Sequence, residues 1–211
     1  MHLLSLNIGW CFAAIAVVGT VYTVIATILA GRFMQSADRA AVPSPAVTIL
    51  KPLHCGEPDL SRNLETFFAQ DYSGPLQIVF GVHDEQDPAV EIVRDLQAKY
   101  PHCDTVIVAD AARYGANAKV SNLINMLPAA RHGTLVLSDS DIAVGPRWLA
   151  QVTQALERPG VGIVTCLYTG EPAQDGHKLW SSLAAMGTSY TFLPNAVVGT
   201  SLELAAPCFG S

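Results

Sequence analysis

The sequence predicts an α/β fold built on a mainly parallel, doubly wound sheet. Short apolar runs rich in β-branched residues alternate with segments in which apolar residues repeat at helical spacing. Such alternation is typical of a parallel sheet with helices on its faces. Right-handed crossovers then bring the carboxyl ends of the strands to one edge. The 211 residues are enough for one such domain with its own core.

The first half of this domain contains two expected strands and two expected helices. Residues 47–50 and 76–82 are apolar runs suited to buried parallel strands. Asp59 or Ser61 can cap a helix between them. Residues 89–99 predict the second helix, because apolar side chains repeat at Val90, Val93 and Leu96.

The second half continues the same alternation. Residues 106–108 and 134–137 are the next expected strands, with a helix near residues 117–127 between them. Pro146 suits the first turn of a further helix, because its fixed φ is compatible with that position. The apolar run 161–166 predicts a fifth strand.

A segment without charge, residues 8–30, precedes the domain. A membrane-spanning helix needs about 20 apolar residues, whereas the apolar core of a signal peptide is about 7–15 residues long and follows a basic start. We therefore expect a membrane anchor over residues 1–31, rather than a signal peptide or a buried soluble helix. Arg32 and Arg39 follow the span against Asp38 alone, so the positive-inside rule predicts that the rest is cytoplasmic.

The remaining composition excludes several classes of protein. The formal net charge of −6, without a basic stripe, argues against binding to nucleic acid. The five cysteines form no C-x-x-C pair and no zinc-type spacing, which indicates free thiols in a reducing compartment.

Residues 32–45 are expected to be a linker and residues 46–211 the α/β domain. The apolar segment 178–191 is expected either to lie along a membrane or to pack on the sheet.

Two acidic loops that follow expected strands form the main candidate site. Asp139 and Asp141 come directly after residues 134–137, and Asp84 follows residues 76–82. Because ligands of open α/β sheets bind beyond the carboxyl ends of the strands, we expect both loops at one edge. Asp139 and Asp141 can hold Mg²⁺ or Mn²⁺ through oxygen atoms and leave positions for substrate phosphates. The alternative is that both are turn and helix-cap residues.

Four motifs together resemble a known family. They are VTILKPLHCGEPDLSRNLETFFAQDY, IVFGVHDEQDPA, GANAKVSNLINM and LVLSDSDI. In this order they resemble the inverting glycosyltransferases with the GT-A fold. The resemblance is greatest to ceramide glucosyltransferases and their bacterial, hopanoid-associated relatives, and it extends over the whole chain.

The resemblance implies roles for five residues. Asp84 would contact the uracil or ribose of a UDP-sugar. Lys119 would lie near the nucleotide and its phosphates, and Asn122 would help to shape that substrate-binding loop. Asp139 would lie by the diphosphate and sugar of the donor. Asp141 would complete an Asp-x-Asp metal site with Asp139.

The resemblance also implies the reaction. It is the transfer of a hexose, glucose or N-acetylglucosamine, from a UDP-sugar to the hydroxyl of a ceramide- or hopanoid-type lipid, with inversion and with Mn²⁺ or Mg²⁺. The enzyme would face the cytoplasm at a bacterial inner membrane. The general base and an Arg-Trp helix are expected beyond Ser211, so no catalytic residue is expected within a chain that is truncated at its C-terminus.

Two other functions remain open on the residues alone. Without a general base, the chain could bind a nucleotide-sugar and catalyse nothing. The run 135–141 also resembles the nucleophile strand of haloacid-dehalogenase-like phosphatases. That motif usually opens its domain and has Thr or Val where this chain has Ala143, which favours the transferase.

Overall fold

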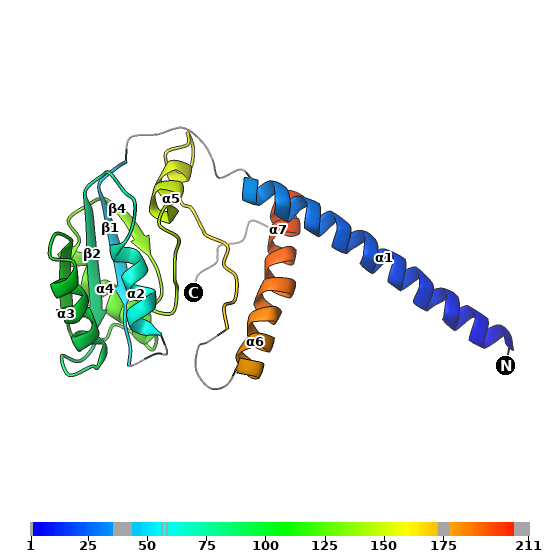
Figure 1. Cartoon of the computed structure of the whole chain (residues 1–211), viewed down its shortest axis with the longest axis horizontal. Helices are drawn as coiled ribbons and strands as arrows, with labels where there is room; N and C mark the ends of the chain where they lie inside the picture. Colours follow the sequence, from blue (N-terminus) through cyan, green and yellow to red (C-terminus); the bar gives the residue numbers. More distant parts are fainter. Residues whose placement is uncertain (1, 36–43, 56, 58, 173–177, 205–211) are drawn as a thin grey trace. The chain divides into compact units, whose positions relative to one another are not determined.

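The computed structural model describes residues 2–35, 44–55, 57, 59–172 and 178–204, which divide into two compact units (Figure 1). Within these residues, the α/β unit comprises 44–164. The helical unit comprises 2–35, 165–172 and 178–204. The boundaries expected for the anchor, the linker and the α/β domain stay a prediction, and most of the expected linker, including Asp38 and Arg39, lies outside the described residues.

The α/β unit contains a four-stranded parallel sheet in the order β3-β2-β1-β4 (Figure 1). Its strands are β1 (Val47–Pro52), β2 (Leu76–Val82), β3 (Asp104–Ala109) and β4 (Thr134–Leu137). Val47 pairs with Leu76 on one side and with Thr134 on the other. This confirms the predicted parallel α/β fold and places all four carboxyl ends at one edge.

The prediction of a fifth strand at residues 161–166 is wrong. These residues are described and form no strand. Ile163 is 75 % exposed, and Gly160 adopts φ 83° just before the segment. An apolar run becomes a strand only where a neighbouring strand offers backbone partners, and composition does not supply such a partner.

Helices cover both faces of the sheet. The first face carries α2 (Leu60–Phe68), α3 (Ala89–Lys99) and α5 (Trp148–Leu156), whose buried side chains form one core with Ile49, Ile78 and Phe80. The second face carries α4 (Ala118–Met126), where Met126 packs with Leu50 and Val79. Both core clusters alternate along β1 and β2, as the two faces of buried strands must. The sheet is therefore doubly wound, as expected.

The helices begin with different capping arrangements. Asn117 caps α4, because its side chain accepts a hydrogen bond from the Val120 amide at 3.1 Å. Asp59 takes the N-cap position of α2 with φ 59°, but its side chain makes no capping bond. Asp87 supports α3 instead, since its Oδ1 accepts from the Ala89 amide at 2.9 Å.

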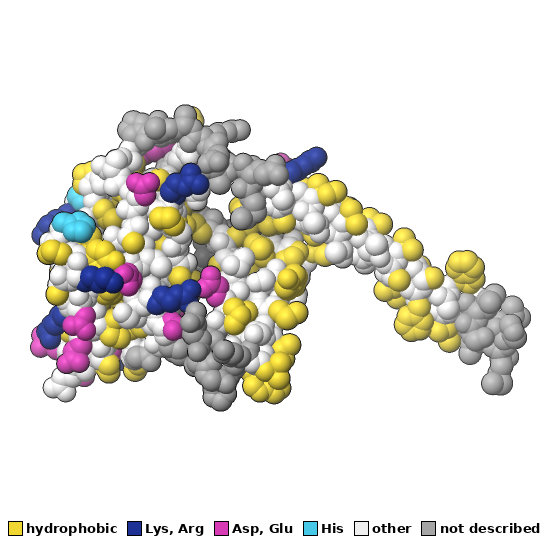
Figure 2. All heavy atoms as spheres, in the orientation of Figure 1, with side chains coloured by type: hydrophobic (Ala, Val, Ile, Leu, Met, Phe, Trp, Pro, Cys, Tyr) yellow, Lys and Arg dark blue, Asp and Glu magenta, His cyan; other side chains and the backbone are white. Residues whose placement is uncertain are grey.

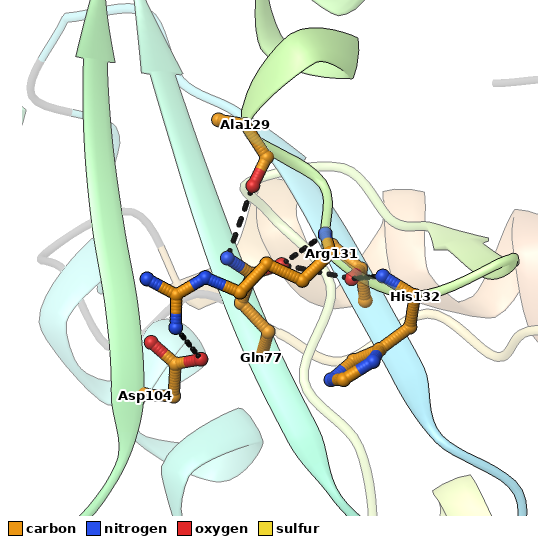
Figure 3. A network of polar contacts seen from close by, with 6 residues as sticks. Gln77, Asp104, Ala129, Arg131 and His132 are labelled. Atoms are coloured by element: carbon orange, nitrogen blue, oxygen red, sulfur yellow. Dashed lines mark hydrogen bonds and ion pairs between the residues drawn. The ribbon is translucent and has the colours of Figure 1, made fainter.

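A buried polar network joins the strands at the opposite, amino-terminal edge of the sheet (Figure 3). The fully buried Gln77 donates to the carbonyl of Ala129 at 3.0 Å. Its Oε1 accepts from Thr48 Oγ1 and from the Arg131 amide, each at 2.9 Å. Arg131 also pairs with Asp104 at 2.6 Å. One glutamine thereby attaches the segment entering β4 to β1 and β2.

The helical unit contains one helix that could cross a membrane. The helix α1 spans His2–Gln35, and within it Asn7–Phe33 is long and apolar enough by length and composition, with a mean hydropathy of 2.2. The other described elements are α6 (Lys178–Gly187), a π-helical turn (Thr188–Phe192) and α7 (Leu193–Ser201). α7 contacts α1, and Tyr22 donates to Asn195 between them. Figure 2 shows hydrophobic side chains along α1 and α6.

Candidate functional site

The candidate site lies at the carboxyl edge of the sheet. Asp84 follows β2 and Asp139 follows β4, and β1 runs between these two strands. Two strand spacings of about 4.8 Å separate β2 from β4 across the sheet, and β2 continues three residues beyond Val79, which is level with the end of β4 at Leu137. The expectation that both acidic loops share one edge is confirmed.

The centre of this edge is occupied by Lys51, near the end of β1. Its side chain is fully buried, and its Nζ lies 3.9 Å from the centroid of the Phe67 ring. Nζ donates to Ser138 Oγ at 3.2 Å and to the backbone carbonyl of Asp139. Lys51 therefore fixes the backbone of the Asp-x-Asp loop from below.

The charge of Lys51 is strongly affected by its surroundings. Burial lowers the pKa of Lys51 from 10.5 to about 7, because the charged ammonium loses water. The carboxylates of Asp139, Asp141 and Glu57 act in the opposite direction and raise this pKa. Lys51 is thus a cation that the fold retains at a cost, and nearby carboxylates offset part of that cost.

A second lysine pairs directly with the acidic loop. Lys119, in the first turn of α4, lies with Nζ 2.5 Å from Asp139 Oδ1. The two side chains are only 29 % and 21 % exposed, so the ion pair is partly screened from solvent. The structure therefore brings together two of the residues singled out from sequence.

Asp139 and Asp141 lie in a turn whose backbone is held at several points. The Ser138 amide donates to the Leu50 carbonyl at 3.2 Å, and Asn63 Nδ2 donates to the Asp141 carbonyl at 3.4 Å. The alternative prediction was that Asp139 and Asp141 are turn and helix-cap residues, and it is correct for the turn. The prediction that they cap the following helix is wrong, because Arg147 occupies the N-cap position of α5. Asp141 itself is exposed.

Asp84 and Asn122 occupy different environments. Asp84 is exposed, and its Oδ1 accepts from the Gln86 amide at 2.9 Å, which orders the start of the loop. Asn122 is buried and donates to the Gly81 carbonyl at 2.9 Å, so it joins α4 to β2. A Cβ on Gly81 would lie 2.4 Å from Asn122 Oδ1. This geometry suits the loop-shaping role of Asn122, and direct substrate contact stays a prediction.

Sequence reasoning missed two residues of this edge. Lys51 directly follows the expected strand 47–50, and a lysine directly after an apolar run is itself a signal for the carboxyl edge. His83 Nδ1 lies 3.1 Å from the Asp110 carbonyl, and its Nε2 lies 2.9 Å from the Ala118 carbonyl. His83 therefore links the end of β3 to the start of α4, immediately before Lys119.

The residues of the Asp-x-Asp loop fit a hard divalent cation. Asp139 and Asp141 offer carboxylate oxygens, which are the donors that Mn²⁺ and Mg²⁺ take. One or two carboxylates leave most of the coordination positions of such a cation to water and phosphate. The ion pair with Lys119 does not oppose this, because an ammonium and a diphosphate attract each other once both are present.

The fold is shared with a solved glycosyltransferase. The mannosyltransferase PcManGT from Pyrobaculum calidifontis, in complex with GDP-Man and Mn²⁺, aligns with a TM-score of 0.50 at 23 % identity. The alignment covers 72 % of this chain and 46 % of that protein. At this identity the likeness establishes the fold, and it confirms the expected GT-A architecture.

Curated relatives and a family model identify the chain more closely. Ceramide glucosyltransferase 1 of Caenorhabditis elegans is 35 % identical over 102 residues, which are 48 % of this chain and 22 % of that protein. Ceramide glucosyltransferase of Komagataella phaffii is 31 % identical over 157 residues, 68 % of this chain and 31 % of that protein. The chain thus spans between about a fifth and a third of these relatives. The family model described as glycosyl transferase family 21 matches residues 11–210, and together with the GT-A sheet and its acidic edge this match makes the chain a member of glycosyl transferase family 21.

Proposed function

We propose that this chain is the donor-binding part of a membrane-anchored hexosyltransferase. The reaction moves glucose or N-acetylglucosamine from a UDP-sugar to the hydroxyl of a ceramide- or hopanoid-type lipid, with inversion and with Mn²⁺ or Mg²⁺. One observation carries the proposal. Asp139 of the Asp-x-Asp loop pairs with Lys119 at the same sheet edge as Asp84, two strands away.

Each residue has a distinct task at this edge. Asp84, exposed on its ordered turn, accepts hydrogen bonds from the ribose or uracil. Lys119 turns from Asp139 toward the diphosphate and adds a point charge there. A divalent cation bound by Asp139 and Asp141 would neutralise the charge that develops on the diphosphate leaving group. Lys51 keeps the Asp139 backbone in place throughout.

The lipid acceptor is supported by the helical unit. α1 is long and apolar enough to cross a bilayer, and α7 packs along it. In α6, Leu179 and Trp180 are 68 % and 72 % exposed, which suits contact with lipid better than contact with water. With Arg32 in the last turn of α1, the positive-inside rule favours a cytoplasmic donor site.

Titration of UDP into the purified chain, with and without Mn²⁺, tests the donor site. We expect binding that requires Mn²⁺ and that weakens at least about tenfold in Asp84→Ala and Asp139→Asn. Asp95→Asn is the matched control, because Asp95 is an exposed carboxylate on α3. Equal binding of UDP by all four proteins would show that the site is wrongly assigned.

A second assay measures sugar transfer and its dependence on Asp139. The chain in lipid vesicles receives a UDP-sugar labelled in its hexose, with ceramide as the acceptor, and the labelled lipid product is measured. Transfer that is lost in Asp139→Asn supports the proposal. Transfer that is unchanged in Asp139→Asn would contradict the role assigned to Asp139.

A further inference from the structure

Three potential metal ligands outside the Asp-x-Asp loop come together where two loops meet. His54 and Cys55 follow β1, and Asp87 lies in the loop between β2 and α3. One ligand atom from each residue lies within 4.8 Å of the others. Cys55 Sγ lies 3.6 Å from His54 Nε2 and 3.7 Å from Nδ1. The cluster therefore offers one sulfur, one nitrogen and one carboxylate oxygen.

The separation of these atoms fits tetrahedral zinc. Zinc binds sulfur at about 2.3 Å and imidazole nitrogen at about 2.0 Å, so a tetrahedral angle places the two ligand atoms about 3.6 Å apart. Either ring nitrogen of His54 is already at that distance from Cys55 Sγ.

Backbone amides hold the carboxylate in position before any ion binds. Asp87 Oδ2 accepts from the Cys55 amide at 3.0 Å, and Oδ1 accepts from the Ala89 amide at 2.9 Å. A carboxylate oxygen that accepts one hydrogen bond retains a lone pair for a metal. Cys55 also adopts φ 56°, which costs a non-glycine residue about 1 kcal/mol. The bond to Asp87 holds this unfavourable conformation.

We propose that His54, Cys55 and Asp87 bind one Zn²⁺ ion, with water in the fourth position. Thiolate and imidazole ligands select Zn²⁺ over Mn²⁺ and Mg²⁺, which prefer oxygen. Binding replaces the thiol proton, so each bound ion releases one proton from Cys55 to solvent. The bound ion joins the loop after β1 to the loop that carries Asp84, three residues before Asp87. Zinc occupancy therefore restricts the loop that carries Asp84.

Competition with a chromophoric zinc chelator, on the chain in detergent and without a histidine tag, measures the affinity. We expect one Zn²⁺ per chain, not displaced by excess Mn²⁺. Affinity falls at least about tenfold in both Cys55→Ser and His54→Ala. The matched controls are Cys166→Ser and His102→Ala, which make the same substitutions at exposed positions outside the cluster. These controls should leave the zinc affinity unchanged.

The rate of Cys55 alkylation gives an independent readout on the unmodified protein. Zn²⁺ should slow alkylation of Cys55 and leave that of Cys166 unchanged, as followed by mass spectrometry of the peptides. Two results would overturn the proposal. One is a zinc affinity in Cys55→Ser equal to that of the native chain, and the other is a Cys55 alkylation rate that does not change when Zn²⁺ is added. Neither readout involves UDP, so a negative result for the zinc proposal can be distinguished from a negative result for the proposed donor site.

Discussion

Replacement of Lys51 by methionine should make the α/β unit more stable at pH 7 and should remove a pH dependence. The folded-state pKa of Lys51 is about 7, against 10.5 for a lysine in water. Each pKa unit corresponds to about 1.4 kcal/mol, so the folded protein retains the charged ammonium at a cost of about 5 kcal/mol below pH 7. Methionine has a similar length and avoids this cost.

The sign of the pH effect follows from proton binding. Between pH 7 and 10.5 the unfolded chain holds the Lys51 proton and the folded chain does not, so the free energy of unfolding rises with pH. From pH 7 to pH 9 the gain is about 2 kcal/mol. Lys51→Met also loses the bonds to Ser138 and to the Asp139 carbonyl, which costs about 1–3 kcal/mol. The variant should therefore be about 2 kcal/mol more stable at pH 7 and equal to the native chain near pH 9.

Urea unfolding in EDTA, followed by tryptophan fluorescence, measures this difference. Trp148 is a suitable probe, because its ring lies 5.6 Å from that of Phe67, the ring beneath Lys51. Trp10 and Trp180 are exposed and are replaced by phenylalanine in every protein compared. A difference between Lys51→Met and the native chain that stays constant from pH 7 to pH 9 would refute the reasoning.

Lys99→Met is the matched control for this series. Lys99 is an exposed lysine that pairs with Glu65 at 2.6 Å, and this pair raises the pKa of Lys99 above 10.5. Both the folded and the unfolded chain therefore keep its charge between pH 7 and pH 9. The stability of Lys99→Met should follow that of the native chain across this range.

Three further substitutions test the packing and the charges. Gly81→Ala should destabilise the α/β unit by about 1–3 kcal/mol, because its Cβ meets side chains of α4 at 2.4 Å, whereas Gly133→Ala has nothing within 4 Å and should cost little in urea unfolding. Gln77→Leu should cost about 2 kcal/mol, because it removes the partners of the buried Thr48 hydroxyl and of the partly buried backbone groups of Ala129 and Arg131. Arg131→Ala should cost less than about 1 kcal/mol in the same assay. Lys119→Met should weaken Mn²⁺-dependent UDP binding by about tenfold in calorimetry; unchanged affinity would remove Lys119 from the donor site.

The sheet was predictable because its strands are short, apolar and separated by clear turn residues. Residues 76–82 and 134–137 coincide with β2 and β4, and residues 89–99 coincide with α3. The segment 161–166 has the same apolar character but pairs with none of the described strands. Hydrophobic composition therefore predicted which segments are buried in the sheet, and it failed where the outcome depended on long-range backbone pairing.

The acidic edge was predictable for a different reason. The carboxyl ends of parallel strands always meet, so Asp84 and Asp139 had to share an edge once the sheet was known. The Lys51 contacts and the Cys55–Asp87 pair were not predictable in this way. They join residues 88 and 32 positions apart in the chain, and only the register of the sheet and the path of each loop bring them together.

The balance of charge at this edge supports the metal requirement of the proposed function. Asp84, Asp139 and Asp141 would repel a diphosphate, and of the two lysines one is already paired with Asp139 while the other is buried beneath the loop. Lysine alone therefore cannot make the edge attractive to a nucleoside diphosphate at neutral pH. In the proposed function, a divalent cation between the carboxylates and the phosphates would make the local charge attractive to the diphosphate and would let Lys119 contact the phosphates. Nucleotide binding without a divalent cation would thus contradict the charge arrangement of this edge.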